Sequence, residues 1–292
     1  MEKKNTNHVS LVQIYTSGYQ KRFDEIFAYG IYIPHKDTFQ IARIQKNQST
    51  KNFLLPLYQY IQSNTGIIFY TFNSKFESSL FFKEYKDIQE EWKNQSLDLY
   101  VELRKYKFLK PRESYSMKSF AKEMDPRSKI TLGPKLYETY YPFEEKDDVP
   151  MFQAIQQNLT AMNTIRKMYE DLLKECKYEA ESFTATIESA QENGKQWEFS
   201  GKISPSYSQF LHKENFLYEE KEGTFSLTIF PIHTYYNQED SCSVIEIPYK
   251  IQNPIPLPEG YLLLAYNKEI YLPQIFTLLH HIRQTPENKE TV

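Results

Sequence analysis

Hydrophobic residues in the first 176 positions form short runs typical of strands and three- or four-residue spacings typical of helices. Strands are predicted at residues 11–15, 25–33, 38–45 and 67–70, and a further strand or a strand–helix junction at residues 97–103. Helices are predicted at residues 51–63, 76–92, 114–123, 136–141 and 150–174. Strands and helices mixed in this order predict an α/β domain with helices covering the sheet.

After Cys176 the hydrophobic pattern changes to a period of two, which is typical of half-buried strands. The clearest example is residues 225–230, where Phe225, Leu227 and Ile229 alternate with polar neighbours. Further strands are predicted at residues 183–187, 197–199, 216–218, 244–251 and 261–266. A closing helix is predicted over residues 273–283. We therefore predict two domains, an α/β domain at residues 9–176 and a smaller β-rich domain at residues 177–285.

Charge and cysteine content limit the classes of protein to which the chain belongs. The net charge of the 292 residues is −3, which gives no overall attraction to nucleic acid. Residues 1–176 carry 26 Lys and Arg against 22 Asp and Glu, whereas residues 177–292 carry 9 against 16. Such asymmetry suggests different partners for the two parts. Two distant cysteines, Cys176 and Cys242, indicate a reducing compartment such as the cytoplasm.

The sequence has no apolar run long enough to cross a bilayer, and its basic start lacks the apolar segment of a signal peptide. We therefore expect no membrane association. Histidines show no metal-ligand spacing, and no glycine-rich phosphate loop or nucleophile elbow is present.

The most informative stretch is residues 67–80, IIFYTFNSKFESSL. Its apolar start predicts a buried strand, and the polar break at Asn73 predicts a loop that leads into a helix. Glu77 then lies where the strand gives way to the helix. Binding groups collect at such strand ends in open α/β sheets. A solvent-exposed acid stabilised by the helix dipole is an equally good interpretation of Glu77.

This stretch resembles the second motif of the DnaQ-like 3′–5′ exonucleases, which have a ribonuclease-H-like fold. Asn73 and the pair Phe76-Glu77 match the Asn and the Phe-acid pair of that motif. Residues 12–19, VQIYTSGY, resemble the first motif, with its two acids replaced by Gln13 and Tyr15. The third acid of the family would fall at Thr160 or the neighbouring Ala161 on the long helix.

The resemblance covers residues 9–175 and is greatest to the YprB-type ribonuclease-H-like domain of bacterial proteins. Asp98-Leu-Tyr, residues 114–120 and Pro134-Lys-Leu-Tyr137 follow the pattern of that branch. The resemblance implies a mixed sheet flanked by helices, followed here by the smaller β-rich domain with its C-terminal helix. It also implies that Gln13, Tyr15, Glu77 and Thr160 occupy vestigial catalytic positions.

Exonucleases of this family bind two divalent metal ions with four acids, because Mg²⁺ prefers carboxylate oxygens and paired ions clamp the scissile phosphate. One of the four acids remains in this chain. We therefore expect no cofactor and no catalytic residue. The alternative is an active exonuclease with a rewired site, in which Glu77 and Asp98 bind Mg²⁺ or Mn²⁺ together with another acid.

A basic segment at residues 104–112, RKYKFLKPR, interleaves cations with two aromatic residues. Phosphate neutralisation combined with base stacking is how proteins hold single-stranded nucleic acid without reading its sequence. The candidate nucleic-acid-binding residues are Arg104, Lys105, Lys107, Lys110 and Arg112. A solvated basic loop is the competing interpretation.

Three functions are compatible with these patterns. The leading hypothesis is a degenerate nuclease that acts as a binding or scaffolding module for single-stranded nucleic acid or for a protein. The second is the active metal-dependent 3′–5′ exonuclease. The third is a purely structural protein that contacts a partner through its acidic, tyrosine-rich C-terminal part.

Overall fold

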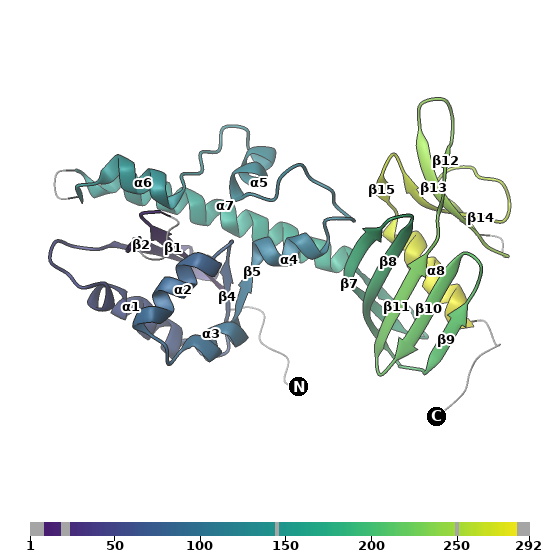
Figure 1. Cartoon of the computed structure of the whole chain (residues 1–292), viewed down its shortest axis with the longest axis horizontal. Helices are drawn as coiled ribbons and strands as arrows, with labels where there is room; N and C mark the ends of the chain where they lie inside the picture. Colours follow the sequence, from purple (N-terminus) through teal and green to yellow (C-terminus); the bar gives the residue numbers. More distant parts are fainter. Residues whose placement is uncertain (1–8, 19–23, 144–145, 249–250, 285–292) are drawn as a thin grey trace. The chain divides into compact units, whose positions relative to one another are not determined.

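The computed structural model describes residues 9–18, 24–143, 146–248 and 251–284. The chain divides into two compact units (Figure 1). The first comprises residues 1–103 and 114–169, and the second comprises residues 104–113 and 170–292. Tyr19, the last residue of the first motif, lies outside the described residues.

A five-stranded mixed sheet, sheet A, forms the centre of the first unit. Its strands are β1 (Val9–Thr16), β2 (Ile26–Ile33), β3 (Thr38–Arg43), β4 (Ile68–Thr71) and β5 (Ser96–Asp98), in the spatial order β3-β2-β1-β4-β5. β1, β2 and β3 pair antiparallel, whereas β4 and β5 continue the sheet parallel to β1. The central strands β1 and β2 are buried along almost their whole length, as strands covered on both faces must be.

Three helices cover one face of sheet A (Figure 1). They are α1 (Thr50–Ser63), α2 (Lys75–Glu84) and α3 (Gln89–Gln95). Their apolar side chains pack on alternate residues of β1 and β2 in one core, in which Trp92 stacks on Phe69 of β4. The single helix predicted for residues 76–92 is therefore wrong. The helix ends at Glu84, and Tyr85 follows in a non-helical conformation. The Tyr85 ring is buried against α1, and its hydroxyl donates to the Lys51 carbonyl.

The other face of sheet A is covered by α7 (Asp148–Glu175). β2 has no side chain at Gly30, where a Cβ atom would lie 2.8 Å from atoms of both Ile155 and Leu159. This glycine lets the long helix approach the strand closely. The remaining elements of this part of the chain are a 3₁₀ turn (Pro34–Lys36), α4 (Leu99–Lys105), α5 (Met117–Met124) and α6 (Gly133–Tyr140).

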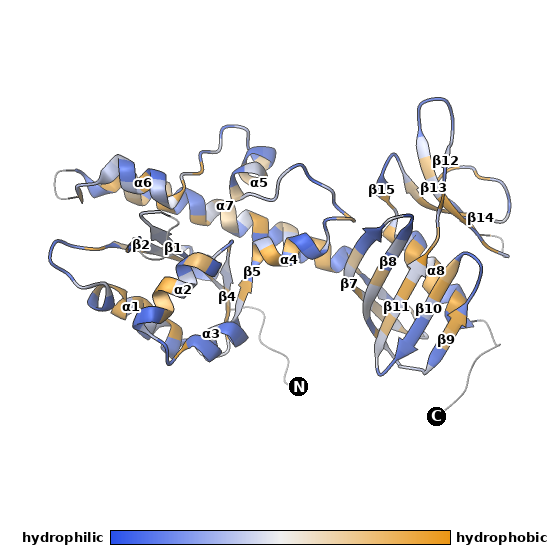
Figure 2. Ribbon diagram, viewed as in Figure 1, coloured by the Kyte–Doolittle hydropathy of each residue, from blue (hydrophilic) through white to orange (hydrophobic). Residues whose placement is uncertain are grey.

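The second unit contains two antiparallel sheets. Sheet B has the order β6-β7-β8-β11-β10-β9, and sheet C has the order β12-β13-β14-β15. Sheet B consists of β6 (Lys177–Glu179), β7 (Thr184–Asn193), β8 (Gln196–Ser204), β9 (Gln209–His212), β10 (Phe216–Lys221) and β11 (Thr224–Ile229). Sheet C consists of β12 (Ile232–Tyr235), β13 (Ser241–Glu246), β14 (Tyr261–Tyr266) and β15 (Glu269–Ile270). Hydrophobic and hydrophilic residues alternate along β11, as Figure 2 shows.

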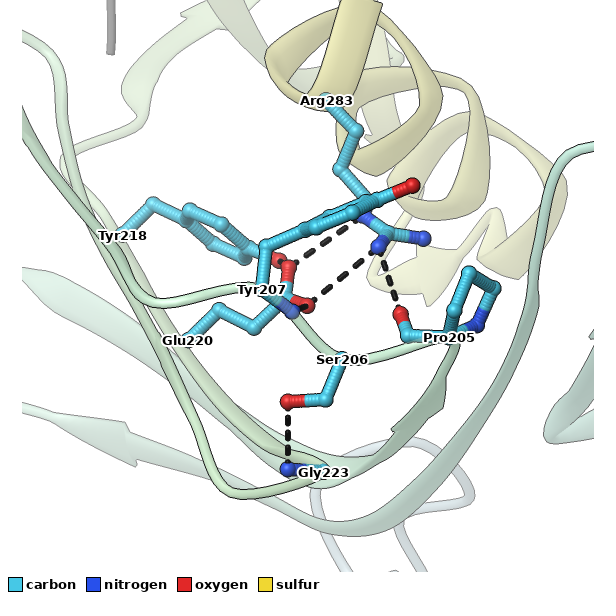
Figure 3. A network of polar contacts seen from close by, with 7 residues as sticks. All are labelled: Pro205, Ser206, Tyr207, Tyr218, Glu220, Gly223 and Arg283. Atoms are coloured by element: carbon cyan, nitrogen blue, oxygen red, sulfur yellow. Dashed lines mark hydrogen bonds and ion pairs between the residues drawn. The ribbon is translucent and has the colours of Figure 1, made fainter. Parts of the chain in front are cut away.

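The C-terminal helix α8 (Leu272–Gln284) packs on sheet B through an apolar face. Phe276 of this helix stacks on Tyr178 of β6 with ring centroids 5.2 Å apart. At the end of the helix, Arg283 forms a buried ion pair with Glu220 of β10 (Figure 3). The predicted fold class is thus confirmed, namely a helix-flanked mixed sheet followed by a β-rich unit with a C-terminal helix.

No helix among the described residues is both long enough and apolar enough to cross a membrane.

Candidate functional site

A pocket of about 390 Å³ opens in the first unit where β1 and β4 end. β1 contributes Gln13 and Tyr15, and the junction between β4 and α2 contributes Asn73 and Glu77. The remaining lining residues come from the same two segments, from α4, from the chain around α5 and α6, and from one residue of α7. These lining residues are Ile14, Thr16, Phe72, Tyr100, Ser114, Tyr115, Ser116, Met117, Ile130, Leu132, Gly133, Pro134 and Asn158. The pocket therefore brings together three of the four predicted positions, Gln13, Tyr15 and Glu77.

Asp98, at the end of β5, holds the junction between β4 and α2 in place. Its carboxylate accepts hydrogen bonds from the backbone N–H groups of Asn73 and Ser74, both at 2.8 Å, and of Tyr100 at 3.0 Å. The Ser74 hydroxyl also donates to it at 3.3 Å. Asn73 has a positive φ of 52°, a conformation that Asn tolerates better than most residues. Asp98 therefore acts as a structural acceptor that fixes the turn carrying Glu77.

A neutral hydrogen-bond network occupies the β1 side of the pocket. The Tyr15 hydroxyl donates to Oε1 of Gln13 at 2.8 Å and accepts from Nδ2 of Asn158 at 3.2 Å. Tyr15 is only 2% exposed, and this burial raises its pKa, while the Asn158 hydrogen bond lowers it to a smaller extent. The phenol therefore stays protonated at neutral pH.

Asn158 also anchors the loop that precedes α6. Its side-chain amide donates to the Thr131 carbonyl at 2.8 Å and accepts from the Thr131 N–H at 3.2 Å. Close to this loop, a Cβ atom at Gly133 would lie 2.9 Å from the carbonyl oxygen of Thr16. The loop is thus held against the end of β1 by a buried amide and by a close backbone approach.

Among the described residues that line the pocket, Glu77 is the only charged one. It is half-buried, and its Oε2 atom has no hydrogen-bond partner within the described part of the chain. Burial raises the pKa of its carboxyl group, a hydrogen bond from its own backbone N–H lowers it, and the nearby Asp98 carboxylate raises it further. Glu77 is thus a partly desolvated acid with one carboxylate oxygen that accepts no hydrogen bond. In Asp98, by contrast, both carboxylate oxygens accept hydrogen bonds.

The donor set of the pocket does not fit two divalent metal ions. Gln13 Oε1 already accepts from Tyr15, and the protonated phenol of Tyr15 is a poor ligand. No group of three or more His, Cys, Asp or Glu side chains within the described ranges is arranged to hold a metal ion. In particular, no third carboxylate of a described residue lies close enough to Glu77 and Asp98 to bind a metal ion together with them.

Thr160 lies outside this pocket. Its side chain is exposed, its hydroxyl donates to the Gln156 carbonyl, and it lines a different surface hollow formed by α5 and α7. The α7 residue that reaches the pocket is Asn158, two positions before Thr160. Its 1% exposure is unusual for an amide, and hydrogen bonds to Tyr15 and to the Thr131 backbone, 143 and 27 residues earlier in the chain, explain it.

The basic segment 104–112 belongs to the second unit. Both of its aromatic residues are used in packing. Tyr106 is buried, and Phe108 contacts Trp197 and Phe199 of β8 with ring centroids 5.2 and 6.4 Å apart. Lys110 pairs with Glu175 at 3.0 Å. The side chains of Arg104, Lys105, Lys107 and Lys110 are exposed, and that of Arg112 is half-buried. The segment therefore exposes cationic side chains to solvent, whereas its two aromatic rings pack inside the second unit.

We expect Tyr15→Phe to lower the free energy of unfolding by about 1 kcal/mol, because it removes two hydrogen bonds and keeps the ring. Urea unfolding measures the change. Tyr29→Phe on β2 is the matched control, since no hydrogen bond joins the Tyr29 hydroxyl to another described residue and its ring is also buried. Equal losses in the two variants would contradict a stabilising role for the network.

Comparison with known proteins gives one family and several solved structures. A family model described as "RNase_H superfamily" matches residues 12–173. No curated protein matches the sequence. The structure "Brucella melitensis NrnC with bound Mg2+" is similar, with 10% identity, a TM-score of 0.42, and coverage of 60% of this chain and 78% of that chain.

Two further similar structures are of exonuclease I. The structure "Exonuclease I (apo)" has 8% identity and a TM-score of 0.39, with 68% of this chain and 57% of that chain covered. "The metal-free form of crystal structure of E.coli ExoI-ssDNA complex" has 9% identity and a TM-score of 0.33, with 67% and 54% covered.

Proposed function

Because this chain belongs to the RNase H superfamily, we propose that it is a catalytically inactive member whose nuclease pocket now serves as a binding pocket. The ribonuclease-H-like fold predicted from the sequence is confirmed by the family match and by the mixed sheet with flanking helices. The YprB-type branch and the loss of the catalytic acids are parts of the proposal.

One observation carries the proposal, the neutral network of Gln13, Tyr15 and Asn158 at the end of β1. Phosphodiester cleavage with two metal ions needs carboxylates there, both to bind the ions and to place them beside the scissile phosphate. Tyr15 and Asn158 instead form a hydrogen bond with one another, which supports a pocket that is stable without metal ions. We accordingly propose no metal cofactor and no catalytic residue.

A nucleic-acid contact outside the pocket is a second part of the proposal. The exposed Arg104, Lys105 and Lys107 offer charge to a phosphate backbone. Base stacking on Tyr106 or Phe108 is not part of it, because both rings pack within the second unit. The acidic second part of the sequence is proposed to contact a protein partner instead.

A cytoplasmic location is proposed as well. Cys176 and Cys242 are both buried and unpaired, as expected of cysteines that fold in a reducing compartment.

The test is incubation of the full chain with end-labelled single-stranded DNA and RNA in Mg²⁺ or Mn²⁺, beside Glu77→Gln. We expect intact strands with both proteins, and a gel shift that weakens as salt rises. Metal-dependent trimming that is lost in Glu77→Gln would establish the active exonuclease and overturn the proposal. Absence of any shift would leave the inactive pocket standing and remove the nucleic-acid part.

A further inference from the structure

The charge of the pocket near Glu77 decides which ligands it accepts. Among the described residues that line it, none is Lys, Arg or His, so Glu77 contributes the only formal charge. A phosphate that entered without metal ions would meet a carboxylate in a partly desolvated site, where like charges repel strongly. A ligand with a positive charge would instead be attracted to the Glu77 carboxylate, whose Oε2 atom is buried without a hydrogen-bond partner among the described residues.

The walls of the pocket favour a flat cation. Phe72, Tyr100 and Tyr115 line it, and the Phe72 ring meets Tyr100 edge-on with centroids 6.0 Å apart. Phe72 and Tyr115 are both also held edge-on by Phe120 of α5. Cations bind the faces of such rings, and guanidinium groups also stack on them. The rings are fixed by their neighbours, so little ordering is needed on binding.

The pocket has room for one long side chain, and its polar atoms suit a guanidinium group. About 390 Å³ lies at the lower end of the range for small-ligand pockets. Besides Glu77, the exposed side chain of Asn73 lies at its edge and offers an amide oxygen. A guanidinium carries five N–H donors in one plane and can serve a carboxylate and an amide together, whereas an ammonium is a compact point charge.

We propose that this pocket binds an arginine side chain presented by a partner protein, with the guanidinium paired to Glu77 and stacked on the aromatic wall. The inference rests on the proposed function, because a pocket that held two metal ions would have no place for a further cation. It assigns to Glu77 the role of a specificity determinant in protein recognition.

The test uses three capped tripeptides, acetyl-Gly-Xaa-Gly amide, in which Xaa is arginine, lysine or citrulline. Citrulline has nearly the shape of arginine without its charge. Each is titrated calorimetrically into the full chain and into Glu77→Gln. We expect the arginine peptide to bind saturably with a Kd of about 1 mM or tighter. We expect binding to weaken about tenfold or more with citrulline or in Glu77→Gln, since a charge-assisted hydrogen bond is lost.

Glu90→Gln is the matched control variant. Glu90 lies on α3 of the same unit, its side chain is 80% exposed, and it pairs with Lys93 rather than facing the pocket. This variant should bind the arginine peptide as the unaltered protein does. Glu77→Gln should not unfold the protein, because it removes a desolvated charge that has an unpaired oxygen, and a melting curve checks this.

Three results would overturn the inference: equal binding of the arginine and citrulline peptides, unchanged binding in Glu77→Gln, or no saturable binding at all. Single-stranded DNA that binds in a Glu77-dependent way and displaces the arginine peptide would also overturn it in favour of nucleic acid. Cleavage assays on the same samples separate the two proposals. Metal-dependent cleavage defeats the proposed function, whereas intact strands without arginine binding defeat only this inference.

Discussion

We expect Arg283→Ala to lower the free energy of unfolding of the second unit by about 3–5 kcal/mol, the usual cost of leaving a buried charge without its partner. The side chains of Arg283 and Glu220 are 4% and 0% exposed, and Arg283 Nε lies 3.2 Å from Oε2 of Glu220. Removing the guanidinium would leave the carboxylate with no counter-charge in a site closed to water.

Several further contacts depend on this ion pair (Figure 3). The Arg283 guanidinium donates to the Pro205 carbonyl at 2.7 Å and is held between the rings of Phe183 and Tyr207, 4.7 and 4.6 Å from their centroids. Glu220 accepts from the Tyr207 N–H at 2.7 Å. The network therefore joins the end of α8 to the chain between β8 and β9 as well as to β10.

The double variant Arg283→Met/Glu220→Gln is the control. Glutamine retains an acceptor for the Tyr207 N–H and removes the charge, so we expect a smaller loss than in Arg283→Ala, because replacing both members of a buried pair costs less than removing one. The protein has two tryptophans, Trp92 in the first unit and Trp197 in the second. Urea unfolding in a Trp92→Phe background thus reports on the second unit through Trp197 fluorescence. A double variant less stable than Arg283→Ala would contradict this account.

The sequence predicts β2 well because residues 26–33 are a continuous apolar run, which is typical of strands buried on both faces. Of the two alternatives for residues 97–103, the strand–helix junction is found, because β5 ends at Asp98 and α4 begins at Leu99. The sequence does not predict β9 and β12, because these strands are four residues long and largely exposed, so burial imposes little pattern on them. The same limit applies to β6, which has three residues.

At the candidate site, the sequence identifies Glu77 because the change from strand to helix is visible locally. It does not reveal the role of Asp98, since the hydrogen bonds of that carboxylate go to backbone N–H groups 24 and 25 residues away that carry no sequence signature. Phe108 presents the same difficulty. A base-stacking ring and a ring packed on Trp197 look alike until the tertiary contact is known.

Restoring acids to β1 should make the stability of the first unit depend on metal ions. We expect Gln13→Asp/Tyr15→Glu to lower the free energy of unfolding by about 3–5 kcal/mol without divalent ions. Position 15 is 2% exposed, and a carboxylate there loses hydration and the Asn158 hydrogen bond. It would also share the pocket with Glu77 and with the new carboxylate at position 13, and like charges at this range repel.

Mg²⁺ or Mn²⁺ should reverse part of that loss, because an ion that binds only the folded state stabilises it by about 2.7 kcal/mol at one hundred times its Kd. Trp92 fluorescence in a Trp197→Phe background measures the unfolding of the first unit. Two controls isolate the cause. Gln13→Asn/Tyr15→Phe introduces no charge and should show no metal response, and adding Glu77→Gln to the double variant should reduce the response. A folded double variant that is indifferent to both ions would refute the identification of positions 13, 15 and 77 as the former metal site.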